Sequence, residues 1–300
     1  MTSLLERLAK GEVLVCDGAM GTMLIERGLK LGECPERWNL EHPEVISDIA
    51  HLYAESGADI VETNTFGGSP LKLAQYRLDA QTTELNIRAV RAARQGVGGK
   101  AMVAASCGPT GRLLKPFGDT EPNEIHAAFR RQLSALLTEG IDAVIIETMT
   151  DLTEATLAVR AAKSLAPDVP VIATMTFDAT PRGFFTIMGV TVAQAVEGLT
   201  NAGADILGSN CGNGIDNMVT IAAEFRKHSD KPLIIQSNAG LPRIENGRAV
   251  YSETPEFMAA RVGTLLDTGV AIIGGCCGTT PEHIGAIRRA VDKILLSKRP

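Results

Sequence analysis

The sequence has no hydrophobic run long enough to cross a membrane and no long run of like charges. A membrane-spanning helix needs about 18 consecutive apolar residues, and no segment approaches that length. The first twelve residues, MTSLLERLAKGE, are too polar for a secretory signal. The 29 basic and 35 acidic side chains are interspersed and give a net charge of −6. We therefore expect a cytoplasmic protein that binds neither nucleic acid nor membranes.

The glycine motifs of nucleotide-binding folds are missing as well. No G-x-G-x-x-G follows the first predicted strand and no G-x-x-x-x-G-K-[ST] occurs, which disfavours a doubly wound open sheet. Eight short, apolar, β-rich runs occur instead, each followed by a loop and an amphipathic stretch, and they begin at Val13, Asp59, Ala101, Ala143, Val171, Ile206, Leu233 and Ala271. This alternation is typical of parallel strands with helical crossovers. We predict an α/β fold, a (β/α)8 TIM barrel, in a single domain over residues 1–300.

Four of the predicted strands share a weak internal repeat. Each is preceded by a glycine of the kind that ends helices, at Gly57, Gly140, Gly203 and Gly269. Seven residues after these glycines stand Asn64, Glu147, Asn210 and Cys276. Since alternate strands of an eight-stranded barrel fill one interior layer, the repeat predicts a polar layer at the barrel mouth. A general helix–glycine–strand pattern of α/β units would also produce such a repeat.

Polar or thiol side chains stand at every predicted strand end. They are Asp17, Asn64, Cys107, Glu147, Asp178, Cys211, Asn238, Cys276 and Cys277. Barrel active sites are built at the C-terminal ends of the strands. The last strand runs into GGCCGTTPEHI, where Thr279 and Glu282 form a T-x-x-E pattern with Pro281 between them. This pattern predicts a capping box at the start of a helix.

Cys211, Cys276 and Cys277 are candidate metal ligands. Adjacent strand residues point to opposite faces, so Cys276 and Cys277 can face one ion only where glycines break the strand. Three thiolates suit zinc and leave one position open for water or substrate, and Asn238 is a candidate weak ligand in the resting state. A redox dithiol, or buried cysteines that only pack, are the alternatives. We expect the other three cysteines, Cys16, Cys34 and Cys107, to be packing thiols.

These motifs together resemble the homocysteine S-methyltransferase family. The resemblance runs through DGAMGT, ETNTF, CGPTG, IET, NC and SNAG to GGCCGTTPEHI, over nearly the whole chain. It implies that Cys211, Cys276 and Cys277 hold Zn²⁺ and that Asn238 can occupy the metal when substrate is absent. It also implies that the amino-acid end of homocysteine is held by Asp17, Gly18, Ala19 and Glu147, and we add Asn64 to this substrate-binding set.

Within the family, CGPTGRLLKPFGD and SNAGLPRIENGRAVY are most similar to the homocysteine domain of cobalamin-dependent methionine synthases. The resemblance implies methyl transfer to the homocysteine thiolate, which gives methionine. With 300 residues leaving no room for folate and cobalamin modules, we expect methylcobalamin on a separate corrinoid protein, or a methyl group derived from 5-methyltetrahydrofolate, as donor. Betaine, S-methylmethionine or S-adenosylmethionine are alternative donors.

Two hypotheses from other functional classes remain open. One is a dithiol oxidoreductase that uses Cys276 and Cys277, and the other is a zinc-storage barrel without catalysis. The sequence also leaves the oligomeric state open, a homo-oligomer included.

Overall fold

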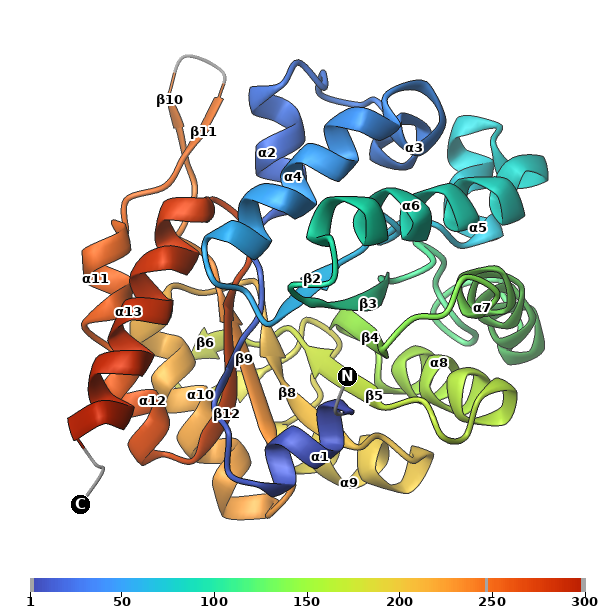
Figure 1. Cartoon of the computed structure of the whole chain (residues 1–300). Helices are drawn as coiled ribbons and strands as arrows, with labels where there is room; N and C mark the ends of the chain where they lie inside the picture. Colours follow the sequence, from blue (N-terminus) through green and yellow to red (C-terminus); the bar gives the residue numbers. More distant parts are fainter. Residues whose placement is uncertain (1–2, 246–247, 298–300) are drawn as a thin grey trace.

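The computed structural model describes residues 3–245 and 248–297, and its centre is a barrel of eight parallel strands enclosed by helices (Figure 1). The strands are β1 (Leu14–Val15), β2 (Ile60–Glu62), β3 (Met102–Cys107), β4 (Ala143–Met149), β5 (Val171–Met175), β8 (Ile206–Asn210), β9 (Leu233–Ser237) and β12 (Val270–Gly275). Their order in the sheet is β1-β12-β9-β8-β5-β4-β3-β2. The eight predicted strands and the TIM-barrel fold are thereby confirmed.

The first and second strands complete the ring. A parallel bridge pairs Cys16 with Ile60. The Asp17 N–H donates to the Ile60 carbonyl at 3.0 Å, and the Asp59 N–H donates to the Val15 carbonyl at 2.7 Å. The sheet therefore closes on itself with a very short β1.

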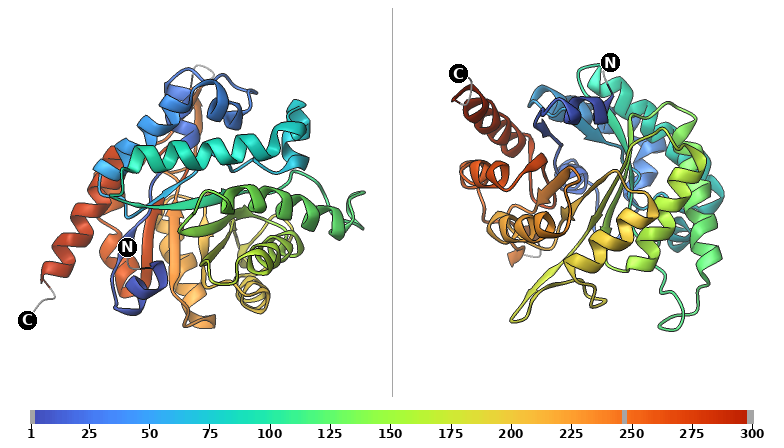
Figure 2. Two further views of the ribbon diagram at one scale, coloured as in Figure 1. Left: turned by 45° about the vertical axis from the view of Figure 1, so that its right-hand side comes forward. Right: turned by 90° about the horizontal axis from the view of Figure 1, so that it is seen from below.

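Helices surround the strands, as the end-on view on the right of Figure 2 shows. They are α4 (Pro43–Glu55), α6 (Thr82–Val97), α7 (Pro122–Leu137), α8 (Leu152–Leu165), α9 (Val192–Ala202), α10 (Ile215–His228), α11 (Pro255–Ala259), α12 (Val262–Asp267) and α13 (Pro281–Ser297). Shorter helices are α1 (Leu4–Ala9), α2 (Met20–Glu26), η1 (Pro35–Arg37), α3 (Trp38–Glu41), α5 (Pro70–Leu73), η2 (Ala74–Tyr76) and η3 (Asp79–Gln81). Within the described residues, no helix is both long and apolar enough to cross a membrane.

Strand side chains alternate between the barrel interior and the helical layer. Twelve buried side chains form the interior cluster, namely Leu4, Leu14, Cys16, Ile60, Met102, Ala104, Ala143, Ile145, Ile172, Ile206, Ile234 and Ile272. Leu4 belongs to α1, so this short helix closes the end of the barrel where the strands begin. Aliphatic side chains therefore fill the barrel interior at the end where the strands begin, and the polar residues lie toward the end where the strands stop.

The four glycines of the internal repeat adopt the left-handed conformation that the repeat predicts. Their φ angles are +94° at Gly57, +69° at Gly140, +104° at Gly203 and +86° at Gly269. Side chains other than glycine rarely adopt such angles. Each glycine therefore ends its helix and turns the chain toward the next strand of the barrel.

Two hairpins extend the barrel beyond the predicted elements. One consists of β6 (Asp178–Thr180) and β7 (Gly183–Phe185), and the other of β10 (Arg243–Glu245) and β11 (Arg248–Val250), which stands above the barrel in Figure 1. Because β5 ends at Met175, the prediction that Asp178 stands at a strand end is wrong. Asp178 is an exposed residue of the β6–β7 hairpin.

The predicted capping box at Thr279 is also wrong. Helix α13 begins at Pro281, one residue later than that pattern requires. The Thr279 hydroxyl instead donates to the Cys276 carbonyl at 2.7 Å and accepts from the Ala19 N–H at 3.2 Å. The His283 ring accepts the Thr280 N–H at 3.2 Å, so a histidine stands where the pattern predicted a glutamate. Thr279 therefore does not cap the helix, and its hydroxyl joins two loops at the barrel mouth.

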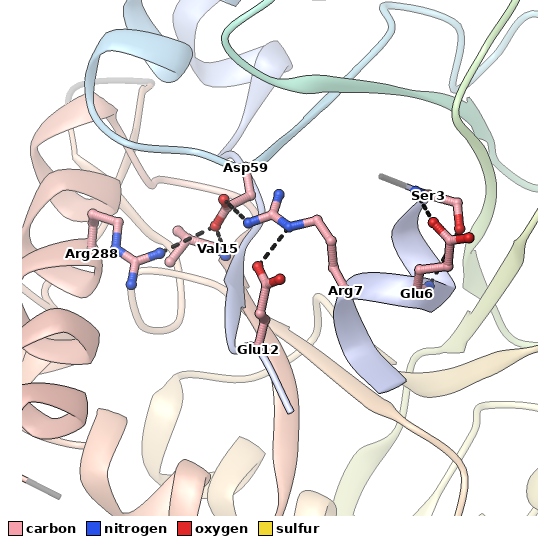
Figure 3. A network of polar contacts seen from close by, with 7 residues as sticks. All are labelled: Ser3, Glu6, Arg7, Glu12, Val15, Asp59 and Arg288. Atoms are coloured by element: carbon pink, nitrogen blue, oxygen red, sulfur yellow. Dashed lines mark hydrogen bonds and ion pairs between the residues drawn. The ribbon is translucent and has the colours of Figure 1, made fainter. Parts of the chain in front are cut away.

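Asp59 ties both ends of the chain to the point where the barrel closes (Figure 3). One carboxylate oxygen accepts from Arg7 at 2.8 Å, and the other accepts from the Val15 N–H at 2.9 Å and from Arg288 at 3.2 Å. Arg7 lies in α1 and Arg288 in α13. A partly buried carboxylate with three donors contributes more than an exposed pair, because less water competes for it.

We predict that Asp59→Asn lowers the free energy of unfolding by about 2 kcal/mol, because an amide cannot satisfy two arginines and a backbone N–H together. The control is Asp48→Asn, since Asp48 pairs with Arg27 but its side chain is 54% exposed, and its expected change is below about 0.5 kcal/mol. Urea denaturation of both variants measures the difference. Equal stabilities would show that the Asp59 contacts are dispensable for closure.

Candidate functional site

Three cysteines converge at the C-terminal ends of β8 and β12. The sulfur atoms of Cys211, Cys276 and Cys277 all lie within 4.8 Å of one another, and those of Cys211 and Cys277 are 3.8 Å apart. A tetrahedral zinc ion with Zn–S bonds of about 2.3 Å separates its sulfur ligands by about 3.8 Å. The cysteines therefore have a spacing that fits a metal ion of this size.

The loop after β12 brings two adjacent cysteines to one side. Cys276 still donates its N–H to the Ser237 carbonyl at 2.7 Å, whereas the Cys277 carbonyl accepts from Ala239 at 2.9 Å. The chain then turns at Gly278, whose φ is +82°. At Gly275 an added Cβ would lie 2.3 Å from the Thr279 hydroxyl, so this close approach also requires glycine.

Cys211 reaches the cluster through an uncommon backbone conformation. Its φ is +60°, in the left-handed region, which costs a residue with a side chain about 1–2 kcal/mol. The Cys211 N–H donates to the Gln236 carbonyl at 3.1 Å, which holds the turn in place. Hydrogen bonds from Cys276 and Cys277 lower the pKa of Cys211, so one thiol of the three is already predisposed to ionise.

Asn238 offers the fourth polar group beside the cysteines. Its side chain is buried, and a hydrogen bond from it contributes to lowering the pKa of Cys211. Its Oδ1 has no hydrogen-bond partner within the described part of the chain. A buried oxygen without a partner next to three thiols fits the donor set of a fourth metal ligand.

Three carboxyl groups lie next to the cysteines, two of them buried and that of Glu62 partly buried. They belong to Asp17, Glu62 and Glu147. The Glu62 N–H donates to Asp17 at 2.9 Å, and the charge of Glu62 contributes to raising the pKa of Glu147. No lysine, arginine or histidine occurs among the described residues that line the adjoining cavity. The carboxyl groups thus form a cluster with no cation of its own.

Burial dominates the protonation of this cluster. It raises the pKa of Asp17 to about 7, and burial together with the charge of Asp17 raises that of Glu62 to about 7. The pKa of Glu147 is raised well above its ordinary value, first by burial and then by the charge of Glu62. An entering ammonium group would supply the missing counter-charge and favour the ionised carboxylates.

A β-bulge directs Glu147 into the cavity. The register of β4 against β5 shifts between Ile146 and Met149, and Thr148 has a φ of +58°. The Thr148 N–H donates to Asn210 Oδ1 at 2.7 Å, and the Ser106 hydroxyl donates to the Glu147 carboxylate. Bulges commonly re-aim side chains beside active sites.

Asn210 connects the acidic cluster to the cysteines. Its Nδ2 lies 3.2 Å from a Glu147 oxygen and 3.8 Å from the Cys276 sulfur. Three of the four residues in the internal repeat, Glu147, Asn210 and Cys276, therefore meet in one polar layer. The fourth, Asn64, donates its amide to the Pro35 carbonyl at 2.8 Å and to Asn39 at 2.9 Å, which anchors the η1–α3 segment to the rim.

A cavity of about 240 Å³ joins the two groups of side chains. Its lining includes all three cysteines, Glu62 and Glu147, with Gly18, Asn64, Met20, Phe66 and Gln236. Asp17 lies behind the lining next to Glu62. The Ala19 N–H is taken by Thr279, as described above. The structure thus brings all the predicted residues to one region, but only Gly18, Asn64, Glu147 and the cysteines face the cavity.

Glu62 and Gln236 are functional candidates that the sequence prediction missed. Gln236 Nε2 donates to Glu62 at 2.7 Å, and its Oε1 is buried without a partner in the ranges described. The available signal was ETNTF, in which the glutamate that ends β2 stands two residues before Asn64.

The remaining cysteines are buried. Burial raises the pKa of Cys16, Cys34 and Cys107, so all three stay protonated. The Cys16 thiol donates toward Asp17 at 3.6 Å and Glu62 at 3.7 Å.

The chain matches the sequence model of a family described as homocysteine S-methyltransferase over residues 14–291. It is 34% identical over 309 residues to a methionine synthase from Mycobacterium leprae, an alignment that covers 97% of this chain and 25% of that relative. It is also 34% identical to a methionine synthase from Mycobacterium tuberculosis, covering 100% of this chain and 26% of the relative. The chain therefore spans about a quarter of the length of these relatives.

Among solved structures, the fold matches the homocysteine methyltransferase MmuM from Escherichia coli. The metallated form superposes with a TM-score of 0.78 at 24% identity, covering 94% of this chain and 97% of that one. The oxidised form gives a TM-score of 0.77 at 25% identity with the same coverage.

We predict that Glu62→Gln stabilises the ligand-free protein at pH 8 by about 2 kcal/mol relative to the unsubstituted chain. A raised carboxyl pKa means that the folded state binds more protons than the unfolded state between about pH 4.5 and pH 7. Stability is therefore lost as the pH rises through that window, and the glutamine removes this loss. Chemical denaturation at pH 5, 6, 7 and 8 measures the slope.

The control for this experiment is Glu84→Gln, because Glu84 is a half-exposed helical residue. Its stability should follow the unsubstituted protein at each pH. If Glu62→Gln showed the same pH slope as the control, the raised pKa of Glu62 would be refuted.

Proposed function

This chain belongs to the homocysteine S-methyltransferase family, and from that premise we propose that it transfers a methyl group to the sulfur of homocysteine, giving methionine. The observation that carries the proposal is the pairing of three convergent thiols with a cation-free carboxyl cluster in one cavity. Homocysteine has a thiol and an ammonium group, and the cavity volume of about 240 Å³ is suited to a small amino acid.

We assign Cys211, Cys276 and Cys277 as ligands of Zn²⁺, with Asn238 as a fourth ligand when substrate is absent. The thiol spacing and the partnerless Asn238 oxygen support this set. When bound, zinc supplies a Lewis acid that keeps a substrate thiol ionised and nucleophilic at neutral pH.

The acidic cluster orients the substrate. Glu62 and Glu147 face the cavity and Asp17 lies behind Glu62, so all three carboxyl groups favour an ammonium group placed against them. Gly18 lines the same end, and because an added Cβ there would lie 2.6 Å from the Thr279 hydroxyl oxygen, the glycine lets this loop pack closely against Thr279. Asn64 fixes the η1–α3 segment as a wall of the cavity. Holding the amino-acid end in this way positions the sulfur toward the cysteines, which is the entropic part of catalysis.

Methyl transfer from a donor to an ionised thiol needs no general base. The sulfur forms its bond to the methyl carbon as the donor takes the bonding electron pair, and the thiol proton has already left. Glu147 and its neighbours act on the ammonium group and not on the reacting atoms. This division of roles predicts that their loss affects binding more than the chemical step.

We propose a methylated corrinoid as the methyl donor. The similarity to methionine synthases, at 34% identity, supports this choice over the sulfonium and betaine donors. A dithiol oxidoreductase using Cys276 and Cys277 is the alternative from another functional class, and its activity would not require a metal ion.

We predict that removing one cysteine ligand removes zinc. Cys211→Ser should retain less than about a tenth of the zinc bound by the unsubstituted chain after dialysis, because three ligands become two thiolates and a weaker hydroxyl. Cys34→Ser is the matched control, since Cys34 is buried near Glu36 and outside the cluster. Metal analysis per chain measures both. Equal zinc contents would contradict the assigned ligands.

We predict that the zinc-loaded chain forms methionine from homocysteine and methylcobalamin, and that Glu147→Gln raises the KM for homocysteine about 10- to 100-fold with a smaller change in kcat. The desamino analogue 4-mercaptobutyrate should be a poor acceptor for the unsubstituted chain. Its disadvantage relative to homocysteine should shrink in Glu147→Gln, with Glu84→Gln as the unchanged control.

Parallel reactions with S-methylmethionine, S-adenosylmethionine and betaine identify the donor. If one of these donors gives methionine and methylcobalamin does not, that compound replaces the proposed donor, and homocysteine remains the acceptor. Activity that persists in the metal-free protein, or no product with any donor, would overturn the proposed function.

A further inference from the structure

Asn213 is a buried residue of the loop after β8, and the sequence prediction gave it no role. Its N–H donates to the Cys211 carbonyl at 2.9 Å, and its carbonyl accepts from the Asn238 N–H at 3.0 Å. Its side-chain Nδ2 donates to the Phe177 carbonyl at 2.6 Å, and its Oδ1 accepts from Asn217 at 2.8 Å. Asn213 therefore joins the three loops that follow β5, β8 and β9 at the barrel mouth.

The hydrogen bond from the Asn213 N–H closes a strained turn that carries Cys211. The bond spans three residues, and Gly212 at its centre has a φ of +75°. A positive φ at this position defines the less common form of γ-turn, in which the backbone is strained. Because Cys211 also has a positive φ, two successive residues lie in the left-handed region. Such a turn persists only where the surrounding structure holds it in place.

The Asn213 side chain fixes this turn to the loop after β5, the strand next to β8 in the sheet. Phe177, whose carbonyl accepts from the amide, is fully buried, and its ring packs edge-to-face against Phe225 with the centroids 5.8 Å apart. One residue earlier, the Thr176 hydroxyl donates to the Asn210 carbonyl at 2.9 Å. The turn is thus attached to a segment that is itself anchored in the hydrophobic core.

The same residue fixes the candidate fourth ligand. Asn238 donates its N–H to the Asn213 carbonyl, and its own side-chain Oδ1 has no partner among the residues that the structure describes. Cys211 and Asn238 are therefore bound to the backbone of one residue, Cys211 through its carbonyl and Asn238 through its N–H. Residues that contact metal ligands from behind orient those ligands and influence metal affinity.

We propose that Asn213 is a positioning residue that sets the placement of Cys211 and Asn238 around one metal ion. This inference rests on the proposed metal site and deepens it, because it assigns the residue that holds two of the proposed ligands. The hydrogen bond from the Asn213 amide to Phe177 keeps the strained turn in its shape before a metal ion enters. The ligands are therefore preorganised.

The test uses Asn213→Ala, which removes both side-chain hydrogen bonds, with Asn86→Ala as the matched control. Asn86 is also buried, and its Nδ2 donates to the Gly68 carbonyl at 2.8 Å and to the Thr82 carbonyl at 2.7 Å. Asn86 lies in α6 and Asn213 in the loop that carries Cys211. Each substitution thus deletes a buried amide with two hydrogen bonds, but only one of them changes the loop of a proposed ligand.

Asn213→Asp is the second variant, for use if the alanine substitution prevents folding. It nearly preserves the side-chain volume and keeps an acceptor for Asn217. It removes the Nδ2 donor and places a carboxylate oxygen against the Phe177 carbonyl instead. The aspartate variant therefore breaks the contact on which the proposal depends with a smaller change in packing.

Three measurements report on the site, and Tm is measured in parallel. Competition with a chelator gives the affinity for zinc, and the visible absorption of bound Co²⁺ reports the coordination geometry. In the metal-free protein, diamide oxidises Cys211 and Cys277 to a disulfide and takes up the two electrons and two protons that the thiols lose. The two sulfur atoms lie 3.8 Å apart, so the rate of this step, followed by peptide mass spectrometry, depends on their placement.

We expect both Asn213 variants to bind zinc about 10- to 100-fold more weakly than the unsubstituted chain. Their Co²⁺ spectra should differ from that of the unsubstituted chain, and the disulfide should form about tenfold more slowly. Asn86→Ala should lower the Tm by a similar amount and leave the zinc affinity, the Co²⁺ spectrum and the disulfide rate unchanged.

Unchanged zinc affinity, Co²⁺ spectrum and disulfide rate in the folded Asn213 variants would overturn the proposal. Equal changes in Asn86→Ala would overturn it as well, since they would show general destabilisation. If the unsubstituted chain binds neither metal ion, the proposed metal site is refuted. The disulfide rate of the metal-free proteins then still decides whether Asn213 positions Cys211.

Discussion

The site depends on a backbone constraint: two adjacent cysteines must present their sulfur atoms on the same side of the chain. A regular strand forbids this, because successive side chains alternate between faces. Strand β12 therefore ends at Gly275, and the chain turns at Gly278 with a φ of +82°. Cys211 meets them from β8 through its own left-handed conformation. The strain in these turns is offset by backbone hydrogen bonds to Ser237, Ala239 and Gln236, so the rigid sheet determines the spacing of the three thiols.

The second organising feature is electrostatic. The carboxyl groups of Asp17 and Glu147 are buried and that of Glu62 is partly buried at the barrel mouth, and the described residues that line the cavity supply no cation to them, which opposes folding at neutral pH. The barrel below supplies the compensation, with an aliphatic interior and a closure point at Asp59 that ties α1 and α13 to the ring. The aliphatic interior and the Asp59 contacts thus lie at the end of the barrel where the strands begin, and the polar site occupies the opposite end. This separation is a general property of (β/α)8 barrels.

The sequence predicted the eight strands because apolar runs bounded by glycine and polar residues are strong local signals, and it predicted the cysteine cluster from strand-end positions in a closed barrel. Other features depended on contacts that no local pattern encodes. Thr279 resembled a helix cap but is engaged by Ala19, which lies 260 positions away in the chain. Glu62 faces the cavity because side chains alternate along β2 and its position points to the barrel interior. Glu147 faces the cavity because of a bulge in β4, and Thr148 gives no sign of that bulge in the sequence. Asp178 was misplaced because the short β6–β7 hairpin follows β5 without a break in composition.

The Thr279 hydroxyl joins the two halves of the site. It donates to the Cys276 carbonyl and accepts from the Ala19 N–H, so the loop that carries the thiols and the loop that follows Asp17 share one side chain. A displacement of either loop strains the same pair of hydrogen bonds. One hydroxyl therefore fixes the position of the Cys276 carbonyl relative to the Ala19 N–H, and the two ends of the cavity are parts of a single hydrogen-bonded unit.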